Sequence, residues 1–421
     1  TFAAMEAGHK FQIDWGDGKP VETEEIAVHT DDWTWTEVSG TPVGEGVIKI
    51  YGEGIDYFGC SSRVDGAQAI ALDVTGAPDL TELTVNANKL TALDLSQNTK
   101  LTDLICSTNP IKQLDLSHNT ELETLEANSM ELESIDLSQN TKLTSIRLNL
   151  NQLESIDLSK NTALKQAYIT DNKLSEIDLS NNDELTYVSL NNNLFTSIDV
   201  TGCAKLGTLF CTGNLQLTEI KINDVTTRVN CSKNNFTLAT LPVLTCKTFT
   251  YAPQNDLPIA EFIKVGETVD LSAQNNITGL ADAPQATVYT WITAEGDTLQ
   301  AGIDYTEEAG KFTFLTTQDS IYCTMETKAF PDATFKTTAI DVQGGGDGVE
   351  SVSGTNAPVI RGGKGIITVD HAAAGTTVAL YDLSGRKVAT QTSAGSRITF
   401  NVKPGLYIVS TGGAARKVNA F

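Results

Sequence analysis

The amino-acid sequence predicts a mainly β protein in which a solenoid of 21-residue repeats is flanked by small β-sandwich domains. Each repeat alternates apolar and polar residues, which is typical of a strand with one buried face. One repeat cannot bury its own apolar side chains, so neighbouring repeats must stack on a shared core. The period is set by Leu80, Leu101, Leu122, Leu143, Leu164, Leu185 and Leu206.

The first half of each repeat, such as LTELTVNAN at residues 80–88, supplies two apolar positions to the predicted core. The first position holds Leu83, Leu104, Leu125, Ile146, Ala167, Val188 and Leu209. The second holds Val85, Cys106, Ala127, Leu148, Ile169, Leu190 and Cys211, and we interpret its cysteines as small buried hydrophobes. An asparagine then stands where the strand must turn, and its amide is expected to bind buried backbone groups: Asn88, Asn109, Asn151, Asn172, Asn193 and Asn214.

The second half of the repeat is nearly constant and carries one aspartate per repeat. Adjacent repeats lie about 4.8 Å apart, so a column of bare carboxylates would repel itself. We expect the aspartates to accept hydrogen bonds from the serine two residues on; ordered calcium is the alternative. The column comprises Asp73, Asp94, Asp115, Asp136, Asp157, Asp178 and Asp199.

The outward positions of the first half differ in every repeat, which favours recognition of an irregular partner. We expect them on the concave sheet, where Tyr168 and Phe210 would wall a notch floored by Ser189, with Arg147 one coil from Tyr168. Such a notch suits a protein or a glycan, and replacing outward Asn149 should cost little stability. The candidate ligand-binding residues are Glu126, Asn128, Arg147, Asn149, Tyr168, Thr170, Ser189, Asn191 and Phe210.

Residues 70–240 resemble internalin-like bacterial leucine-rich repeats. The resemblance implies a binding surface on the concave sheet and no catalysis. The 21-residue length and the IDLSxNT second half depart from the family pattern, so short strands or extended turns are expected on the convex side in place of a helix.

The regions before and after the repeats are predicted to be separate β modules. Residues 1–53 are a β-rich cap whose IDWGDG string resembles the WGDG turn of PKD-like modules; Asp14 and Asp17 there fit a structural turn, with calcium as the alternative. Residues 54–245 are assigned to the solenoid. Residues 246–343 resemble an immunoglobulin-like spacer domain through Trp291 and Cys323, without the intersheet disulfide, because Leu271 stands where the earlier cysteine would. Residues 344–349 are a glycine-rich linker.

Residues 350–421 carry VALYDLSGRKV, PGLYIV and a late RKV in that order. This arrangement closely resembles the C-terminal sorting domain of type IX secretion. The resemblance implies a protein secreted by a Gram-negative bacterium or held on its outer-membrane surface; a lipoprotein route is the alternative.

Composition narrows the remaining classes of function. The formal net charge of −24 argues against nucleic acid as a partner, and no apolar run is long enough to span a bilayer. No catalytic motif, metal-ligand spacing or cofactor motif is present, so we expect neither an enzyme nor a cofactor. We therefore predict a monomeric recognition protein acting in adhesion; the alternative is a structural surface spacer with no dedicated ligand.

Overall fold

The structure, a computed structural model, describes residues 2–4, 10–22, 28, 35–44, 46–61, 68–244, 246–331, 333–344, 358–363, 365–382, 385–395, 397–411 and 414–420. Contacts divide the chain into two units. The first contains residues 1–255 with 278–284 and 329–335, and the second contains 256–277, 285–328 and 336–421. Most of the predicted linker, residues 345–349, lies outside the described residues.

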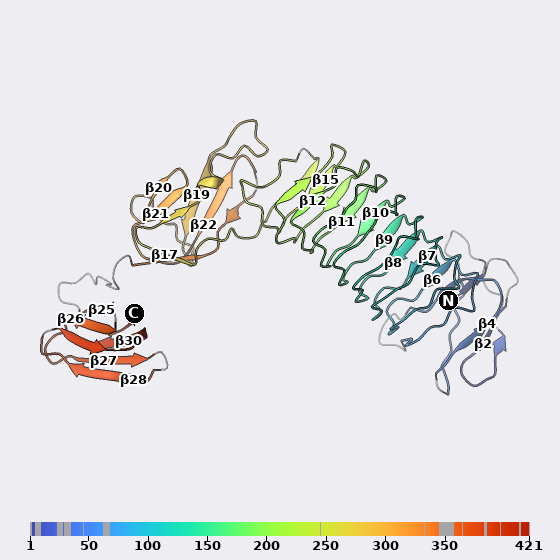
Figure 1. Cartoon of the computed structure of the whole chain (residues 1–421), viewed down its shortest axis with the longest axis horizontal. Coiled ribbons are helices and arrows are strands. Elements are labelled where there is room, and N and C mark those ends of the chain that lie inside the picture. The colour runs from blue at the N-terminus through green and yellow to red at the C-terminus, as the bar shows by residue number, and fades with distance from the viewer. Residues whose placement is uncertain are drawn as a thin grey trace. The chain divides into compact units, whose positions relative to one another are not determined.

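The first unit is a solenoid built on one large sheet, to which each coil from β6 onward contributes a strand of three residues (Figure 1). Within the described residues the sheet has eleven strands in the order β1-β5-β6-β7-β8-β9-β10-β11-β13-β15-β16. All pairs are parallel except β1 with β5. The strands are β1 (Phe2–Ala4), β5 (Ile55–Gly59), β6 (Glu82–Thr84), β7 (Asp103–Ile105), β8 (Thr124–Glu126), β9 (Ser145–Arg147), β10 (Gln166–Tyr168), β11 (Tyr187–Ser189), β13 (Thr208–Phe210), β15 (Arg228–Asn230) and β16 (Thr248–Thr250).

The core follows the predicted pattern, which confirms the fold class. Every residue in the two predicted inward positions, from Leu83 to Cys211, has no solvent-exposed surface. The middle residue of each strand points inward, and the residues on either side of it point outward. For example, Ala167 pairs in register with Ile146 and Val188 of the adjacent coils.

The chain turns sharply after each strand at a residue with left-handed backbone. The positions are occupied by Ala87, Thr108, Ser129, Leu150, Asp171, Asn192, Gly213 and Lys233, with φ between 51° and 75°. The predicted asparagine follows this turn and ties its own coil to the preceding one. Asn109 Nδ2 donates to the carbonyl of Val85 at 2.9 Å, and its Oδ1 accepts from the N–H of Leu90 at 3.1 Å. These buried amides are structural, as expected.

The side of the coils opposite the large sheet is made of extended turns, as the sequence indicates. A second column of buried asparagines bonds successive coils here; Asn140 Nδ2 donates to the carbonyls of Leu116 at 3.0 Å and Asn119 at 2.8 Å. Within the described residues, only β12 (Ser197–Asp199) and β14 (Glu219–Lys221) pair as strands on this side.

The N-terminal region forms a small sheet of β2 (Gln12–Asp14), β3 (Val21–Glu22) and β4 (Lys49–Tyr51). Its core contains Phe11 and Ile13. Asp14 organises the predicted turn, because its Oδ1 accepts from the N–H groups of Gly16, Asp17 and Gly18 at 2.8, 3.1 and 3.0 Å. These bonds lower the pKa of Asp14 and give it a structural role.

Residues 256–343, most of which belong to the second unit, contribute two sheets around Trp291. One sheet has the order β17-β24-β22-β19, with β23 on β22, and the other has the order β18-β21-β20. Trp291 is buried against Phe312 and Phe314 and pairs in register with Cys323, a free thiol. The elements are β17 (Phe262–Lys264), β18 (Thr268–Asp270), the short helix η1 (Ser272–Gln274), β19 (Thr287–Ile292), β20 (Tyr305–Glu308), β21 (Lys311–Phe314), β22 (Gln318–Thr327), β23 (Phe335–Lys336) and β24 (Ile340–Gln343).

The C-terminal residues form two further sheets, β25-β26-β29 and β28-β27-β30-β31. Ile367, Val378, Leu380 and Val409 lie in their common core. The VALYDLSGRKV motif falls on the hairpin of β27 and β28, and the PGLYIV motif falls on β30; Leu383 and Ser384 lie outside the described residues. The strands are β25 (Val359–Gly363), β26 (Ile366–Asp370), β27 (Thr377–Asp382), β28 (Lys387–Thr392), β29 (Ile398–Asn401), β30 (Gly405–Thr411) and β31 (Ala414–Ala420).

Candidate functional site

A continuous row of aromatic and arginine side chains crosses the outward face of the large sheet. It begins at Arg147 on β9 and ends at Arg228 on β15, with one aromatic ring on each of the three strands between them. We call this set, namely Arg147, Tyr168, Tyr187, Phe210 and Arg228, the aromatic–arginine row.

Each member of the row contacts the next. The guanidinium carbon of Arg147 lies 4.3 Å from the centre of the Tyr168 ring. The Tyr168 and Tyr187 rings are 4.7 Å apart and inclined by 31°. Tyr187 meets Phe210 edge-on at 5.6 Å and 85°, and the guanidinium carbon of Arg228 lies 5.2 Å from the Phe210 ring. The row therefore combines ring stacking with cation–π contacts at both ends.

The predicted notch between Tyr168 and Phe210 is wrong, because Tyr187 fills it. Tyr187 contacts both rings. The predicted floor, Ser189, is only 4 % exposed, and its hydroxyl is hydrogen-bonded to Thr170 Oγ1 at 2.9 Å. Tyr187 could have been found from the sequence, because it occupies the first outward position of its strand. The same position holds Gln166 and Thr208 in the adjacent strands.

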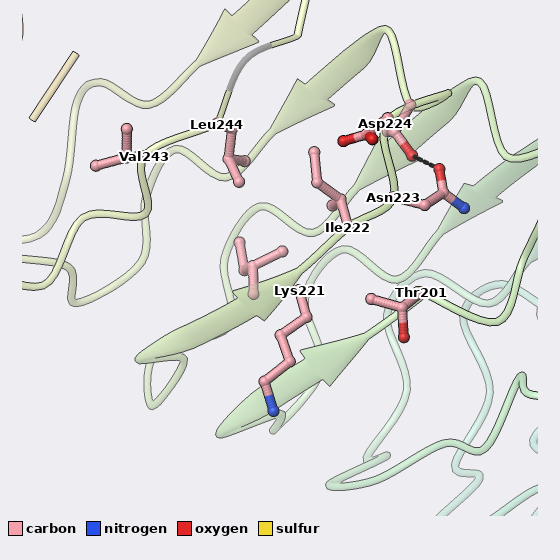
Figure 2. A pocket seen from close by; sticks show the side chains of 9 residues that line it. Thr201, Lys221, Ile222, Asn223, Asp224, Val243 and Leu244 are labelled. Atoms are coloured by element: carbon pink, nitrogen blue, oxygen red, sulfur yellow. Dashed lines mark hydrogen bonds between the residues drawn. The ribbon is translucent and has the colours of Figure 1, made fainter.

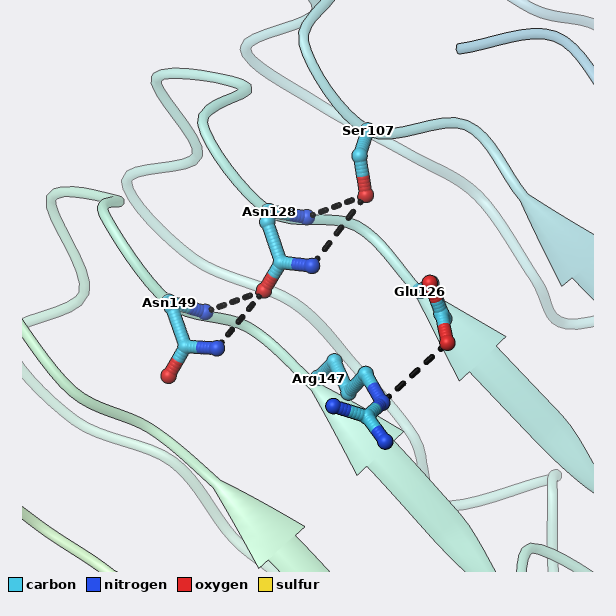
Figure 3. Close-up of polar contacts among 5 residues, drawn as sticks. All are labelled: Ser107, Glu126, Asn128, Arg147 and Asn149. Carbon is cyan, nitrogen blue, oxygen red and sulfur yellow. Dashed lines mark hydrogen bonds and ion pairs between the residues drawn. The ribbon is translucent and has the colours of Figure 1, made fainter.

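A polar column beside the row is occupied by hydrogen bonds between coils (Figure 3). Asn149 donates from its backbone and side-chain nitrogens to Asn128 Oδ1 at 2.9 and 3.0 Å. Asn149 Oδ1 in turn accepts from the N–H of Thr170 at 2.9 Å, and Asn191 Oδ1 accepts from Thr212 at 2.8 Å. These predicted contact residues brace the sheet, since their acceptor oxygens already serve the next coil.

The two ends of the row differ in charge pairing. Arg147 Nε lies 3.1 Å from Glu126 Oε1, an ion pair between adjacent strands (Figure 3). Arg228, by contrast, is exposed and forms no ion pair with any residue in the described part of the chain.

Burial and the neighbouring Tyr168 raise the pKa of Tyr187, so its hydroxyl stays protonated at neutral pH. Tyr187 and Arg228 are not among the candidate residues predicted from the sequence.

The aspartate column satisfies its own charges by hydrogen bonding. In each coil the aspartate accepts from the backbone N–H two residues on, as Asp136 does from Ser138 at 2.8 Å. Backbone and hydroxyl hydrogen bonds from Ser138 lower the pKa of Asp136 more than the carboxylates of Asp115 and Asp157 raise it. Within the described ranges, no group of three or more His, Cys, Asp and Glu is placed to hold a metal ion.

A hollow of about 370 Å³ lies beside β14, on the side of the coils opposite the large sheet (Figure 2). It forms where the coil spacing changes from 22 residues to 20. Ile220, Ile222, Val243 and Leu244 supply apolar walls. Lys221, which points away from them in Figure 2, forms an ion pair with Glu219 at 3.4 Å. The rest of the lining is polar, namely Thr201, Asn223, Asp224 and Thr226. Asn223 is already hydrogen-bonded to the carbonyl of Cys203 and to Thr226 Oγ1, so we take the aromatic–arginine row as the stronger candidate site.

Comparison with known proteins gives structural neighbours only. No protein-family profile matches the sequence, and no curated protein matches it. The chain is 21% identical to the functional domain of InlJ from Listeria monocytogenes, which includes a cysteine ladder; the match covers 66% of this chain and 80% of that one, with a TM-score of 0.34.

Two further solved structures illustrate the range of these neighbours. An internalin C2 from Listeria monocytogenes is 26% identical over 36% of this chain and 67% of that one, with a TM-score of 0.30. The leucine-rich repeat ectodomain of the receptor kinase GASSHO1/SCHENGEN3 from Arabidopsis thaliana, solved with CASPARIAN STRIP INTEGRITY FACTOR 2, is 18% identical. It covers 49% of this chain and 30% of that one, with a TM-score of 0.33.

Proposed function

We propose that this protein is a non-enzymatic recognition protein that binds a partner macromolecule through the outward face of its large parallel sheet. The observation that carries the proposal is the aromatic–arginine row. Tyr168, Tyr187 and Phe210 are each part-exposed on the sheet surface. Aromatic rings and arginine are the residue types that most often dominate binding energy at interfaces, and five of them in unbroken contact form one candidate hot spot.

The proposed location is the bacterial cell exterior, with the repeats displayed for adhesion. The support is the resemblance of the C-terminal motifs to type IX sorting domains and of the repeats to internalin-like proteins. On this proposal, residues 1–53 and 246–343 are PKD-like and immunoglobulin-like modules, and residues 350–421 are the export address. Within the described residues, no helix is long and apolar enough to cross a membrane.

The test is a screen of the full-length chain on combined protein and glycan arrays. A Tyr168→Ala, Tyr187→Ala double variant should lose the captured ligand while keeping a cooperative unfolding transition. Tyr51→Ala is the matched control, because Tyr51 is an exposed tyrosine (46 %) on β4, outside the row. A ligand that binds the double variant as tightly as the wild type would refute the row as the site.

The second candidate is a structural spacer with no dedicated ligand, and one observation favours it. Side chains of the polar column from Ser107 to Thr212 form hydrogen bonds between coils, and a rigid spacer requires such bonds. On that reading the row only stiffens the sheet. No array ligand would then depend on Tyr187, and the double variant would change stability alone.

A further inference from the structure

We infer that the ligand of the aromatic–arginine row is an extended acidic polypeptide whose carboxylates reach the guanidinium groups of Arg147 and Arg228. This inference rests on the proposed function and names the ligand class for the same site.

Neighbouring side chains cover both ring faces of Tyr168 and one ring face of Phe210, which disfavours a sugar ligand. Tyr168 lies on β10 between β9 and β11, so Arg147 covers one face of its ring and Tyr187 the other. Arg228 covers a face of Phe210. Sugars bind aromatic side chains through the ring face, whereas the edge of an aromatic ring carries partial positive charge. The row therefore presents edges, hydroxyls and guanidinium groups, all of which favour anionic or carbonyl oxygens.

The polar column gives the same result by a separate route. A glycan would need amide and hydroxyl groups free to pair with its own hydroxyls. The oxygens of Asn128, Asn149 and Asn191 already accept backbone N–H groups of the next coil. Recognition must then come chiefly from charge and shape, and the charge of the row is positive at both ends.

Both arginines retain donors for a carboxylate. The ion pair of Arg147 with Glu126 uses Nε, and in Figure 3 the two terminal nitrogens of its guanidinium make no contact with the other four residues drawn. Arg228 has no acidic partner among the described residues, although the chain has a net charge of −24. A planar guanidinium binds a carboxylate through two parallel N–H bonds.

The spacing between the arginines sets the spacing of the acidic residues. Arg147 and Arg228 are separated by four steps in the strand order β9-β10-β11-β13-β15. At about 4.8 Å per step the two strands lie about 19 Å apart. An extended peptide advances about 3.3 Å per residue, so acidic residues about six positions apart would reach both guanidinium groups.

Substitutions of Glu126 and Arg228 should change the affinity for an acidic peptide in opposite directions. The carboxylate of Glu126 already pairs with Nε of Arg147. A carboxylate of the ligand must therefore share the guanidinium group with Glu126 or displace it. Glu126→Gln should tighten binding of an acidic peptide, because it frees Arg147 and removes a like charge. Arg228→Gln should weaken binding by about tenfold, since it removes a charge-assisted contact. A glycan or an apolar ligand gives no reason for this pair of opposite effects.

The experiment selects random dodecapeptides displayed on phage against the immobilised full-length chain. Peptides carrying two Asp or Glu residues five to seven positions apart should be enriched. The leading peptide is then measured by fluorescence anisotropy against the wild type, Glu126→Gln and Arg228→Gln. Arg386→Gln is the charge control, because Arg386 is an exposed arginine on the C-terminal hairpin, outside the row. Affinity should rise for Glu126→Gln, fall for Arg228→Gln and stay unchanged for the control.

Enrichment of peptides without paired acids, or equal affinity of all four proteins, would overturn the inference. Capture of an acidic polysaccharide such as polygalacturonate in place of peptides would also overturn it. If an array ligand depends on Tyr168 and Tyr187 but ignores Arg228 and Glu126, the proposed function stands and only the ligand class fails. If no ligand depends on the row, the proposed function fails as well.

Discussion

The ring of Tyr187 lies 4.7 Å from the ring of Tyr168 although the two residues do not face each other in the strand register. Tyr168 is paired with Ser189, and Tyr187 is paired with Gln166. The contact is therefore diagonal across two parallel strands. The row changes outward position at three steps. It passes from the second position to the first at Tyr187, back to the second at Phe210, and again to the first at Arg228. These diagonal contacts keep it continuous from Arg147 to Arg228.

The first prediction concerns the contribution of this stack to stability. Tyr187→Ala should lower the free energy of unfolding by about 1–2 kcal/mol, because it removes ring contacts with both Tyr168 and Phe210. Tyr187→Phe keeps the ring and should cost less than about 0.5 kcal/mol. Urea denaturation of the full-length chain measures both values. Equal losses for the two variants would show that the hydroxyl, and not the stack, stabilises this surface.

The repeat period was sufficient to predict the core, whereas the candidate site needed the structure. Leu83 and its equivalents are fixed by alternation along a strand, because a strand exposes every second residue to the same side. The row depends on diagonal contacts between long side chains, and these depend on rotamers as well as register. When the repeats are aligned, Tyr168 falls in the same position as Ser189 and Phe210. Tyr187 lies in a different position of the repeat, so the alignment did not reveal it.

The role of the polar column could not be predicted for a similar reason. Asn149 was expected to be an outward residue of little structural weight. In the structure its side chain accepts from Thr170 and donates to Asn128. An outward position in a solenoid can still bond to the coils on either side, and alternation along one strand does not reveal this.

The second prediction follows from that finding. Asn149→Ala should cost about 1–2 kcal/mol, because it leaves the N–H of Thr170 without its acceptor. Leu148→Ala should cost about 2–5 kcal/mol, since Leu148 is fully buried with coils on both sides. Gln152→Ala, at an exposed position in the same coil, should cost about 0.5 kcal/mol or less. A loss for Asn149→Ala no larger than for Gln152→Ala would show that the column is not structural.

The third prediction concerns the left-handed turn after each strand. Leu150 has φ 59° and is 57 % exposed, whereas the equivalent positions in later coils hold Asn192 and Gly213. Left-handed backbone is costly for a leucine and better tolerated by asparagine. Leu150→Asn should therefore raise the free energy of unfolding by about 0.5–1 kcal/mol. Gly213→Ala, with φ 75° and its added methyl against Asn192 Oδ1, should lower it. Changes of the same sign in urea melts would contradict this account.

The fourth prediction concerns the buried thiols. Burial raises the pKa of Cys106 and Cys231 to about 12, so only about one thiol in ten thousand is ionised at pH 8. Because the thiolate is the reactive form, iodoacetamide should leave both residues unmodified in the native protein. Labelling, followed by peptide mapping, should begin only along the urea unfolding transition. Modification of Cys106 without denaturant would show that the coils open locally.

The last prediction concerns acid stability and the aspartate column. Hydrogen bonds from Ser117, Ser138 and Ser159 lower the pKa of the aspartate two residues before each of them in the folded state. A carboxyl whose pKa is lower in the folded than in the unfolded chain stabilises the fold above its unfolded pKa. That stability is lost as the pH falls through the folded pKa. The column should therefore make the protein less stable as the pH falls below about 4.

A triple variant, Asp115→Asn with Asp136→Asn and Asp157→Asn, isolates this contribution, because asparagine can still accept the serine N–H but does not titrate in this range. As the pH is lowered from about 5 to about 2, a range that brackets the ordinary aspartate pKa, the urea midpoint of this variant should fall less steeply than that of the wild type. The matched control replaces exposed Glu133 and Glu154 of the coils that hold Asp136 and Asp157, and exposed Glu176 of the next coil, by glutamine. The control changes net charge equally and should keep the wild-type slope more closely than the aspartate variant does. If the two triple variants flatten the pH dependence to the same extent, general charge relief explains the effect, and the hydrogen-bonded column does not.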